Sequence, residues 1–145
     1  MDRGELNHFN KKKQMKETEK ICMIDDDEIY IFLIKKSLSA MGINNEVISF
    51  INGSDALEAL IQLKTNNEEL PGIILLDINM PIMDGWEFLT EFRKVNIDTY
   101  KKIPIYIVSS SIANEDFEKS KTFPEILDYL SKPVELETLV SILNF

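Results

Sequence analysis

The sequence predicts an α/β fold, a doubly wound parallel sheet of five strands with helices on both faces. Short apolar runs alternate five times with amphipathic, helix-like segments along the chain, and this alternation is typical of a parallel sheet with right-handed crossover connections. A second observation is that most of the apolar runs end in charged or hydroxyl side chains. Because ligands of open α/β sheets bind at the carboxyl ends of the strands, these endings are the candidate functional residues.

The central strand of this prediction is the apolar run at residues 73–76, which ends on the carboxylate of Asp77. Turn-forming residues follow it, among them Asn79 and Gly85. An apolar-periodic helix is then expected over residues 86–94. Asp77 is therefore expected at a corner between a strand and a loop, on the edge of the sheet where ligands bind.

The other elements follow from continuous apolar runs for buried strands and apolar stripes of helical spacing for helices. Strands are expected over residues 20–24, 47–51, 103–108 and 127–130. Helices are expected over residues 29–41, from a turn at 52–55 to residue 66, over 112–121, and around the apolar positions 136, 139, 140 and 143. The stripe of the first helix is expected at positions 29, 33, 34, 38 and 41, with Gly42 as the stop signal.

The composition fits one acidic domain. The chain has 145 residues, of which 44% are hydrophobic, enough for one core and too few residues for a second domain. Its formal net charge of -9 argues against direct binding to nucleic acid, whose phosphates it would repel. No stretch approaches the roughly 18 apolar residues of a membrane span. The single Cys22 excludes an internal disulfide and is consistent with a reducing compartment, so we expect a cytoplasmic location without membrane insertion.

Residues 1–19 are polar, lack sustained periodicity and are expected to form a flexible leader, which places the domain at residues 20–145. The only histidine, His8, lies in this leader, so a catalytic or phosphorylated histidine is not expected. Residues 1–20 carry six basic and four acidic side chains, whereas residues 21–145 carry ten and twenty-one. The folded part is therefore strongly acidic.

Four consecutive acids, from Asp25 to Glu28, follow the first predicted strand. Their mutual repulsion is costly, and a bound cation is the usual remedy. The alternative is that some of them cap the next helix at its amino terminus, where negative charge is favoured. Asp27 is expected to be that cap, whereas Asp25 and Asp26, directly after the strand, are expected to bind a metal ion.

Four of the predicted strand ends carry side chains that suit one chemistry. They are Asp25 with Asp26, then Asp77, Ser109 and Lys132. A carboxylate cluster can hold Mg²⁺, a carboxylate can attack phosphorus, and a hydroxyl and an ammonium can bind phosphoryl oxygens. Each residue alone has a plainer interpretation, because Lys132 could be an ordinary strand-end lysine and Ser109 an ordinary helix cap. The combination predicts phosphoryl transfer to an aspartate.

With these motifs the sequence resembles the receiver domain of two-component response regulators, in particular the single-domain chemotaxis type. The resemblance rests on residues 76–81, Leu-Asp-Ile-Asn-Met-Pro, on Asp84-Gly85, and on the acid pair, the serine and Lys132-Pro133 in the family's order. It covers residues 20–145. It implies a flavodoxin-like strand order 2-1-3-4-5.

The resemblance also implies roles at the acidic end of the sheet. Asp77 would accept the phosphoryl group, and Asp26 and Asp77 would bind Mg²⁺ directly. Asp25 would contribute to the metal through water, and Asn79 through its backbone carbonyl.

Further roles implied by the resemblance concern the fourth and fifth strands. Ser109 and Lys132 would hold the phosphoryl oxygens, with a cis peptide bond before Pro133 as a candidate for aiming the lysine. Ser109 and Tyr129 would form the switch that changes the surface after phosphorylation. A plain strand aromatic is the alternative for Tyr129, since strands favour tyrosine.

The expected function is that of a stand-alone response regulator in signal transduction. It would take a phosphoryl group from a sensor histidine kinase or a histidine phosphotransfer protein, as a direct regulator or in a phosphorelay, and alter binding to an unknown protein target. It is not expected to be an enzyme, although a receiver assists its own phosphorylation and dephosphorylation. One alternative is a haloacid-dehalogenase-like phosphatase, which the Asp25-x-Asp27 pattern also resembles, with Asp25 as nucleophile. Another is a receiver-like binding module that works without phosphorylation.

Overall fold

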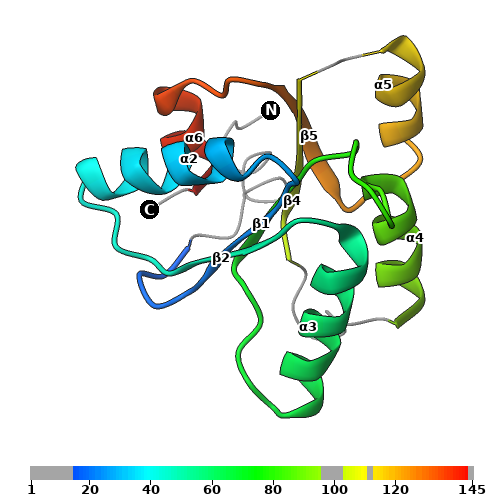
Figure 1. Cartoon of the computed structure of the whole chain (residues 1–145), viewed down its shortest axis with the longest axis horizontal. Helices are drawn as coiled ribbons and strands as arrows, with labels where there is room; N and C mark the ends of the chain where they lie inside the picture. Colours follow the sequence, from blue (N-terminus) through cyan, green and yellow to red (C-terminus); the bar gives the residue numbers. More distant parts are fainter. Residues whose placement is uncertain (1–14, 96–102, 111–112, 144–145) are drawn as a thin grey trace, which may run out of the picture.

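The computed structural model describes residues 15–95, 103–110 and 113–143, which form one five-stranded sheet in the order β2-β1-β3-β4-β5 (Figure 1). All four strand pairings are parallel. The strands are β1 (Ile21–Ile24), β2 (Val47–Phe50), β3 (Ile73–Leu76), β4 (Ile105–Ser109) and β5 (Ile126–Ser131). The predicted fold class and strand order are confirmed.

In the described part of the chain, five helices cover the two faces of the sheet. They are α2 (Glu28–Ala40), α3 (Gly53–Thr65), α4 (Gly85–Val95), α5 (Asn114–Ser120) and α6 (Leu136–Leu143). Helices α2 and α6 lie on one face, and α3, α4 and α5 lie on the other (Figure 1). Within the described residues, the boundaries of the elements lie within two residues of the predicted ones. The start predicted at residue 112 for the helix that ends near residue 121 lies outside the described residues. Within the described ranges, no helix combines the length and the apolar character that crossing a bilayer requires.

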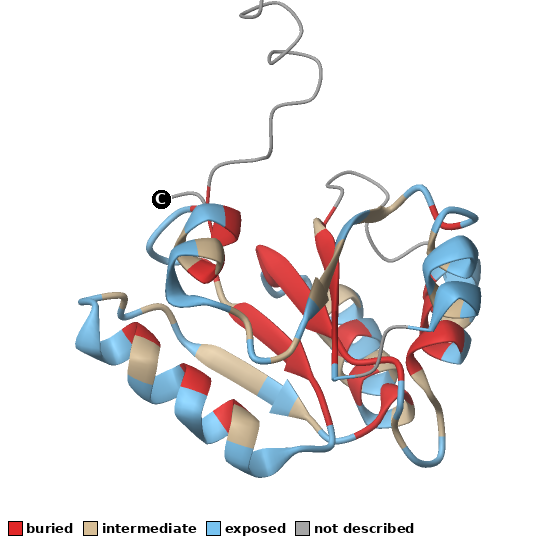
Figure 2. Ribbon diagram, turned by 90° about the horizontal axis from the view of Figure 1, so that it is seen from above, coloured by how far each residue is buried: buried red, intermediate tan, exposed pale blue. Residues whose placement is uncertain are grey.

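The central strands are buried on both faces, which explains why they are continuous apolar runs rather than alternating ones. In β1, Ile21 and Met23 belong to the core under α2 and α6, whereas Cys22 and Ile24 belong to the core under α3 and α4. The edge strand β2 is only partly buried (Figure 2). The carboxyl ends of β1, β3 and β4 are therefore held in place by packing from both sides.

The amino termini of α2 and α3 are capped by the side chains that precede them. Asp27 accepts a hydrogen bond of 3.0 Å from the backbone N–H of Tyr30, as predicted. Asn52 accepts one of 2.8 Å from the backbone N–H of Asp55. These caps fix the positions where the two chains leave the sheet and turn into helices.

The predicted apolar stripe of α2 was correct at Ile34 and Leu38 and wrong at its other positions. Ile31, Ile34 and Leu38 are the residues that face the core. Ile29 and Leu33, predicted to be part of the stripe, are 74% and 53% exposed. The reason is that residues 29–34 are apolar throughout, so several helical stripes fit the sequence and only packing against the sheet selects one.

Residues 15–19, assigned from the sequence to the leader, pack against the domain. Met15 is 5% exposed and joins the core beneath α2 and α6, and Glu19 is 2% exposed. The Asn45 side chain donates hydrogen bonds of 2.9 and 2.7 Å to the backbone carbonyls of Lys16 and Glu19. The packed chain thus starts earlier than residue 20, because the polar sequence around Met15 hides one apolar anchor. The rest of the predicted leader lies outside the described residues.

Candidate functional site

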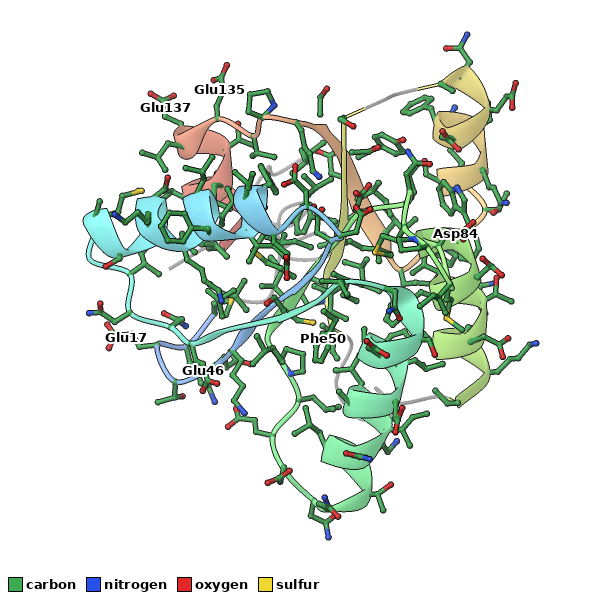
Figure 3. All side chains as sticks on the ribbon, in the orientation of Figure 1. Glu17, Glu46, Phe50, Asp84, Glu135 and Glu137 are labelled. Carbon is green, nitrogen blue, oxygen red and sulfur yellow. The ribbon has the colours of Figure 1, made fainter. Side chains whose placement is uncertain are left out.

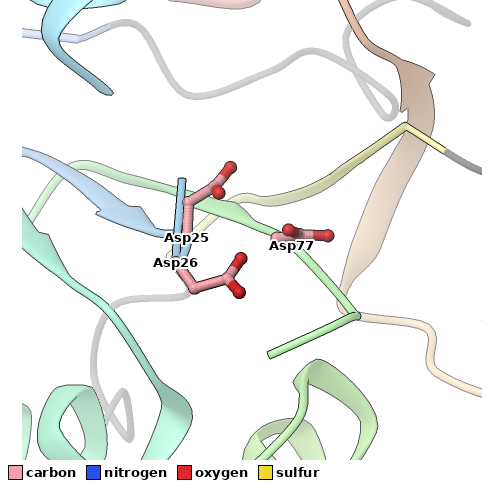
Figure 4. A group of neighbouring side chains, drawn as sticks. All are labelled: Asp25, Asp26 and Asp77. Carbon is pink, nitrogen blue, oxygen red and sulfur yellow. The ribbon is translucent and has the colours of Figure 1, made fainter. Parts of the chain in front are cut away.

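Three carboxylates gather at the carboxyl ends of β1 and β3. Asp25, Asp26 and Asp77 each place a carboxylate oxygen within 4.8 Å of the others (Figure 4). Asp25 and Asp77 are buried, with 2% and 6% of their surface exposed, and Asp26 is exposed. Backbone hydrogen bonds to neighbouring strands fix the positions of the two buried residues. The N–H of Asp25 donates to the carbonyl of Phe50 at 2.9 Å, and the N–H of Asp77 donates to the carbonyl of Ile24 at 2.8 Å.

Lys132, which follows β5, supplies a positively charged ammonium group to the site. Its Nζ lies 2.7 Å from Oδ2 of Asp25 and 3.5 Å from Oδ2 of Asp77, and its side chain is 11% exposed. Its backbone N–H donates to the carbonyl of Ser109 at 2.9 Å, which ties it to the end of β4. The peptide bond from Lys132 to Pro133 is cis, at the proline for which the resemblance implied it.

The charges of this cluster do not balance. Burial raises the pKa of both Asp25 and Asp77, although Lys132 pulls each in the opposite direction. Burial would lower the pKa of Lys132, but the hydrogen bond and charge of Asp25 and the charge of Asp77 outweigh it, so this pKa is raised. One ammonium among three carboxylates leaves an excess of negative charge that a further cation can offset.

The donor set fits a magnesium ion. Mg²⁺ prefers oxygen ligands, and it commonly keeps several waters while binding one or two carboxylates. Asp25, Asp26 and Asp77 supply such oxygens on one side of the sheet edge. Asn79 is exposed and adjoins them, with its backbone N–H donating to Oδ1 of Asp77 at 3.2 Å.

The loop from β3 to α4 is packed closely against the backbone at Asp77. The backbone N–H of Gly85 donates to the carbonyl of Ile78 at 3.0 Å. A Cβ atom at Gly85 would lie 2.6 Å from the carbonyl oxygen of Asp77, so only glycine fits there. On the other side, the N–H of Gly53 donates to the carbonyl of Met83 at 2.9 Å, which joins the loop to α3.

Ser109 ends β4, and Tyr129 lies on the neighbouring strand β5, two residues before its end. Ser109 is fully buried, and Tyr129 is half-buried on the neighbouring strand. Burial raises the pKa of Tyr129, as does the charge of Asp116, whereas a hydrogen bond with Ser109 acts to lower it. The structure therefore brings all the predicted site residues to the edge formed by β1, β3, β4 and β5.

The family of the chain follows from its similarity to known proteins. The sequence profile of the response regulator receiver domain matches residues 21–144. The chain belongs to the response regulator receiver family. Within it, receivers are signalling phosphoacceptor domains, and the match gives no support to a haloacid-dehalogenase-like phosphatase.

Similar receivers occur in larger proteins. The chain is 32% identical over 124 residues to the sensor histidine kinase CheAY of Helicobacter pylori, covering 86% of this chain and 14% of the kinase. It is 32% identical to hybrid signal transduction histidine kinase G of Dictyostelium discoideum, covering 86% of this chain and 3% of that protein. The chain thus spans a small part of these relatives.

Solved structures of other receivers share the fold. A two-component response regulator from Cytophaga hutchinsonii has a TM-score of 0.78 and 29% identity, covering 89% of this chain and 96% of that one. The phosphorylated cyanobacterial phytochrome response regulator RcpA has a TM-score of 0.69 and 29% identity, covering 88% and 89%. The Mn²⁺-bound response regulator Rcp1 has a TM-score of 0.67 and 27% identity, covering 87% and 89%.

Sequence reasoning missed one aromatic residue at the site of this receiver. The ring of Tyr30 lies under the ammonium of Lys132, with Nζ 4.6 Å from the ring centroid. Tyr30 is one of two aromatic residues in the apolar run of α2, and its place in the first turn after the Asp27 cap was the signal that could have indicated it.

Proposed function

We propose that this receiver accepts a phosphoryl group on Asp77. The observation that carries the proposal is the buried Asp77 carboxylate, with Oδ2 3.5 Å from Lys132 and two further acids beside it. The relationship to phosphorylated RcpA supports it. A buried carboxylate that lies beside an ammonium and a cation site can react with phosphorus and keep the charged product stable.

In the proposed reaction an oxygen of Asp77 attacks the phosphorus of phosphohistidine. The O–P bond forms as the N–P bond breaks, the bonding electrons leave on the histidine nitrogen, and that nitrogen takes up a proton when it requires one. The ammonium of Lys132 and the hydroxyl of Ser109 hold phosphoryl oxygens of the acyl phosphate. In dephosphorylation, water attacks the phosphorus, the O–P bond to Asp77 breaks, and the Asp77 carboxylate is regenerated as inorganic phosphate leaves. The receiver thus takes part in both phosphorylation and dephosphorylation.

Asp25, Asp26 and Asp77 would hold Mg²⁺, with Asn79 contributing its backbone carbonyl and Asp25 acting through water. Bound there, Mg²⁺ would supply positive charge to the phosphoryl oxygens. The carboxylate spacing supports this assignment, and so does the relationship to Mn²⁺-bound Rcp1.

The output we propose is a change in protein binding through Ser109 and Tyr129. When Ser109 moves to the phosphoryl group, its hydrogen bond with Tyr129 is exchanged and the ring turns into the space that is left. This would alter the surface of α5, β5 and α6 and thereby the affinity for a protein target.

The phosphodonor we propose is a sensor histidine kinase or a histidine phosphotransfer protein in the cytoplasm. Similarity to the receiver parts of a sensor histidine kinase and a hybrid histidine kinase supports this class of partner. Both direct regulation of a target and onward transfer in a phosphorelay agree with the chemistry of the site.

The deciding experiment is intact-protein mass after incubation with acetyl phosphate, with and without Mg²⁺, for wild type and Asp77→Asn. We expect one phosphoryl adduct on the wild type that requires Mg²⁺ and is absent from the variant. Adduct formation that persists in Asp77→Asn and is lost in Asp25→Asn would instead favour the phosphatase. Absence of both an adduct and Mg²⁺ binding would favour a module that works without phosphorylation.

A further inference from the structure

Tyr30 contacts the cation of the proposed acceptor site from a different element. It lies in the first turn of α2, the helix that follows β1. Lys132 follows the edge strand β5, which is separated from β1 by β3 and β4. The Nζ atom of Lys132 lies 4.6 Å from the centroid of the Tyr30 ring. An ammonium over an aromatic face is attracted by the negative charge of that face, and more strongly where water is excluded. Lys132 is largely buried, so the contact meets this condition.

The hydroxyl of Tyr30 contacts the chain just after Lys132. Its oxygen accepts a hydrogen bond from the backbone N–H of Val134, two residues beyond the lysine. Tyr30 and Val134 both pack against the core beneath α2 and α6. The phenol ring therefore joins α2 to the chain around Pro133, and its position is set by packing rather than by solvent.

The distances around Lys132 show why a third contact matters. Nζ is closer to Asp25, at 2.7 Å, than to Asp77, at 3.5 Å. The ammonium is therefore shared between two carboxylates, and the ring of Tyr30 is its third contact. The ring of Tyr30 carries no net charge and holds the ammonium without competing with the phosphoryl oxygens for it.

We propose that Tyr30 is a positioning residue for phosphoryl transfer, which holds the ammonium of Lys132 where it can reach a phosphoryl group on Asp77. This inference rests on the proposed function of the site. Tyr30 acts through Lys132 and contacts neither the phosphorus nor the attacking oxygen. Its removal should therefore slow phosphorylation only while Lys132 is present.

A double-mutant cycle tests this dependence. The rate of Asp77 phosphorylation by acetyl phosphate at saturating Mg²⁺ is measured for wild type, Tyr30→Leu, Lys132→Met and the double variant. We expect Tyr30→Leu to slow the reaction about 5- to 10-fold in the wild-type background and less than about 2-fold in the Lys132→Met background. Tyr30→Phe keeps the ring and should remain within about 3-fold of wild type. The Mg²⁺ affinity of Tyr30→Leu should stay within about 2-fold of wild type, because the three carboxylates are untouched.

Phe32→Leu is the matched control. Phe32 also lies on α2 beneath a lysine, with Nζ of Lys36 5.5 Å from its ring centroid, but on the exposed surface of the helix. Its loss should leave the phosphorylation rate unchanged. Should Tyr30→Leu fail to fold, Tyr30→Met provides a flexible replacement without a ring.

The contact itself can be measured without phosphorylation. The Cε protons of Lys132 should show an upfield ring-current shift in the NMR spectrum of wild type and Tyr30→Phe, which disappears in Tyr30→Leu. Equal slowing by Tyr30→Leu with and without Lys132, or no slowing at all, overturns the positioning role. An unphosphorylated wild type with an intact ring-current shift rejects the proposed function and leaves the contact established.

Discussion

At the scale of single residues, the proposed acceptor site combines burial with incomplete charge compensation. Burial is the main cause that raises the pKa of Asp77 above its ordinary value of 3.8, and Lys132 offsets it only in part. In the folded state the carboxyl therefore holds its proton to a higher pH than in the unfolded chain. Below the pKa of the unfolded chain, Asp77 is protonated in both states and its ionisation does not change the free energy of unfolding. Above the raised pKa of the folded state, ionisation lowers the free energy of unfolding by its full amount.

Replacing this carboxylate with its isosteric amide should therefore stabilise the protein near neutral pH. We expect Asp77→Asn to raise the free energy of unfolding by about 1 kcal/mol at pH 7 without Mg²⁺. The amide oxygen can still accept from the N–H of Asn79, and Lys132 keeps Asp25 at 2.7 Å. Urea unfolding at several pH values measures the difference, which should shrink as the pH falls through the raised pKa of Asp77 and be lost below its ordinary value of 3.8. A variant less stable than wild type at pH 7 would contradict this account.

At the scale of elements, the junction from β1 to α2 positions helix α2, and the junction from β3 to α4 positions the loop that follows Asp77. Predicting the existence of each element needed only periodicity, and the caps at Asp27 and Asn52 are readable from residue type. The buried face of α2 was not readable, because residues 29–34 are apolar all round and only contact with the sheet distinguishes Ile31 from Ile29. The contact of Tyr30 with Lys132 depends on that same orientation.

The junction between β3 and α4 depends on the absence of a side chain at Gly85. In Gly85→Ala the added methyl would lie 2.6 Å from the carbonyl oxygen of Asp77, so the backbone of the loop has to move. We expect a loss of about 1 to 3 kcal/mol in unfolding free energy and a weaker affinity for Mg²⁺. Gly42→Ala is the control, because φ is +79° there and no atom lies within 4 Å of the added methyl. It should destabilise by about 1 kcal/mol and leave Mg²⁺ affinity unchanged.

Helix α5 lies beside β5 and contacts Trp86 of α4 through its side chains. None of its described residues is buried, but Asp116 accepts a hydrogen bond of 3.3 Å from the Trp86 indole, which itself stacks on Phe123 at 5.7 Å. Elements with few buried contacts open locally before the whole domain unfolds.

Removing this hydrogen bond should free α5 while the rest of the domain stays folded. For Asp116→Ala we expect faster amide exchange in residues 113–121 and a loss of less than about 1 kcal/mol in global stability. Glu115→Ala removes the exposed neighbouring acid and should leave the exchange in α5 unchanged. Equal exchange in the two variants would mean that Trp86 does not hold α5 through Asp116.

At the scale of the whole molecule, the sequence was most informative about the edge of the sheet. In a parallel sheet every strand ends on the same side, so residue types at strand ends predict a shared site without any knowledge of packing. The acidic surface was also predictable, and Figure 3 shows Glu17, Glu46, Glu135 and Glu137 at the periphery of the molecule. The start of the packed chain was not, because one methionine in a polar segment gives no periodicity.

The contribution of residues 15–19 to the whole domain can be measured by comparing two truncated chains, one starting at residue 15 and one at residue 20. The longer chain keeps Met15 in the core and Glu19 against Gly72, together with the hydrogen bonds from Asn45. Losing a buried methionine side chain costs about 2 kcal/mol or more, so the chain starting at residue 20 should unfold at a lower urea concentration. Met15→Ala in the longer chain should reproduce much of the loss, since burial of that side chain is its main cause. Equal stability of the two chains would return the boundary to residue 20.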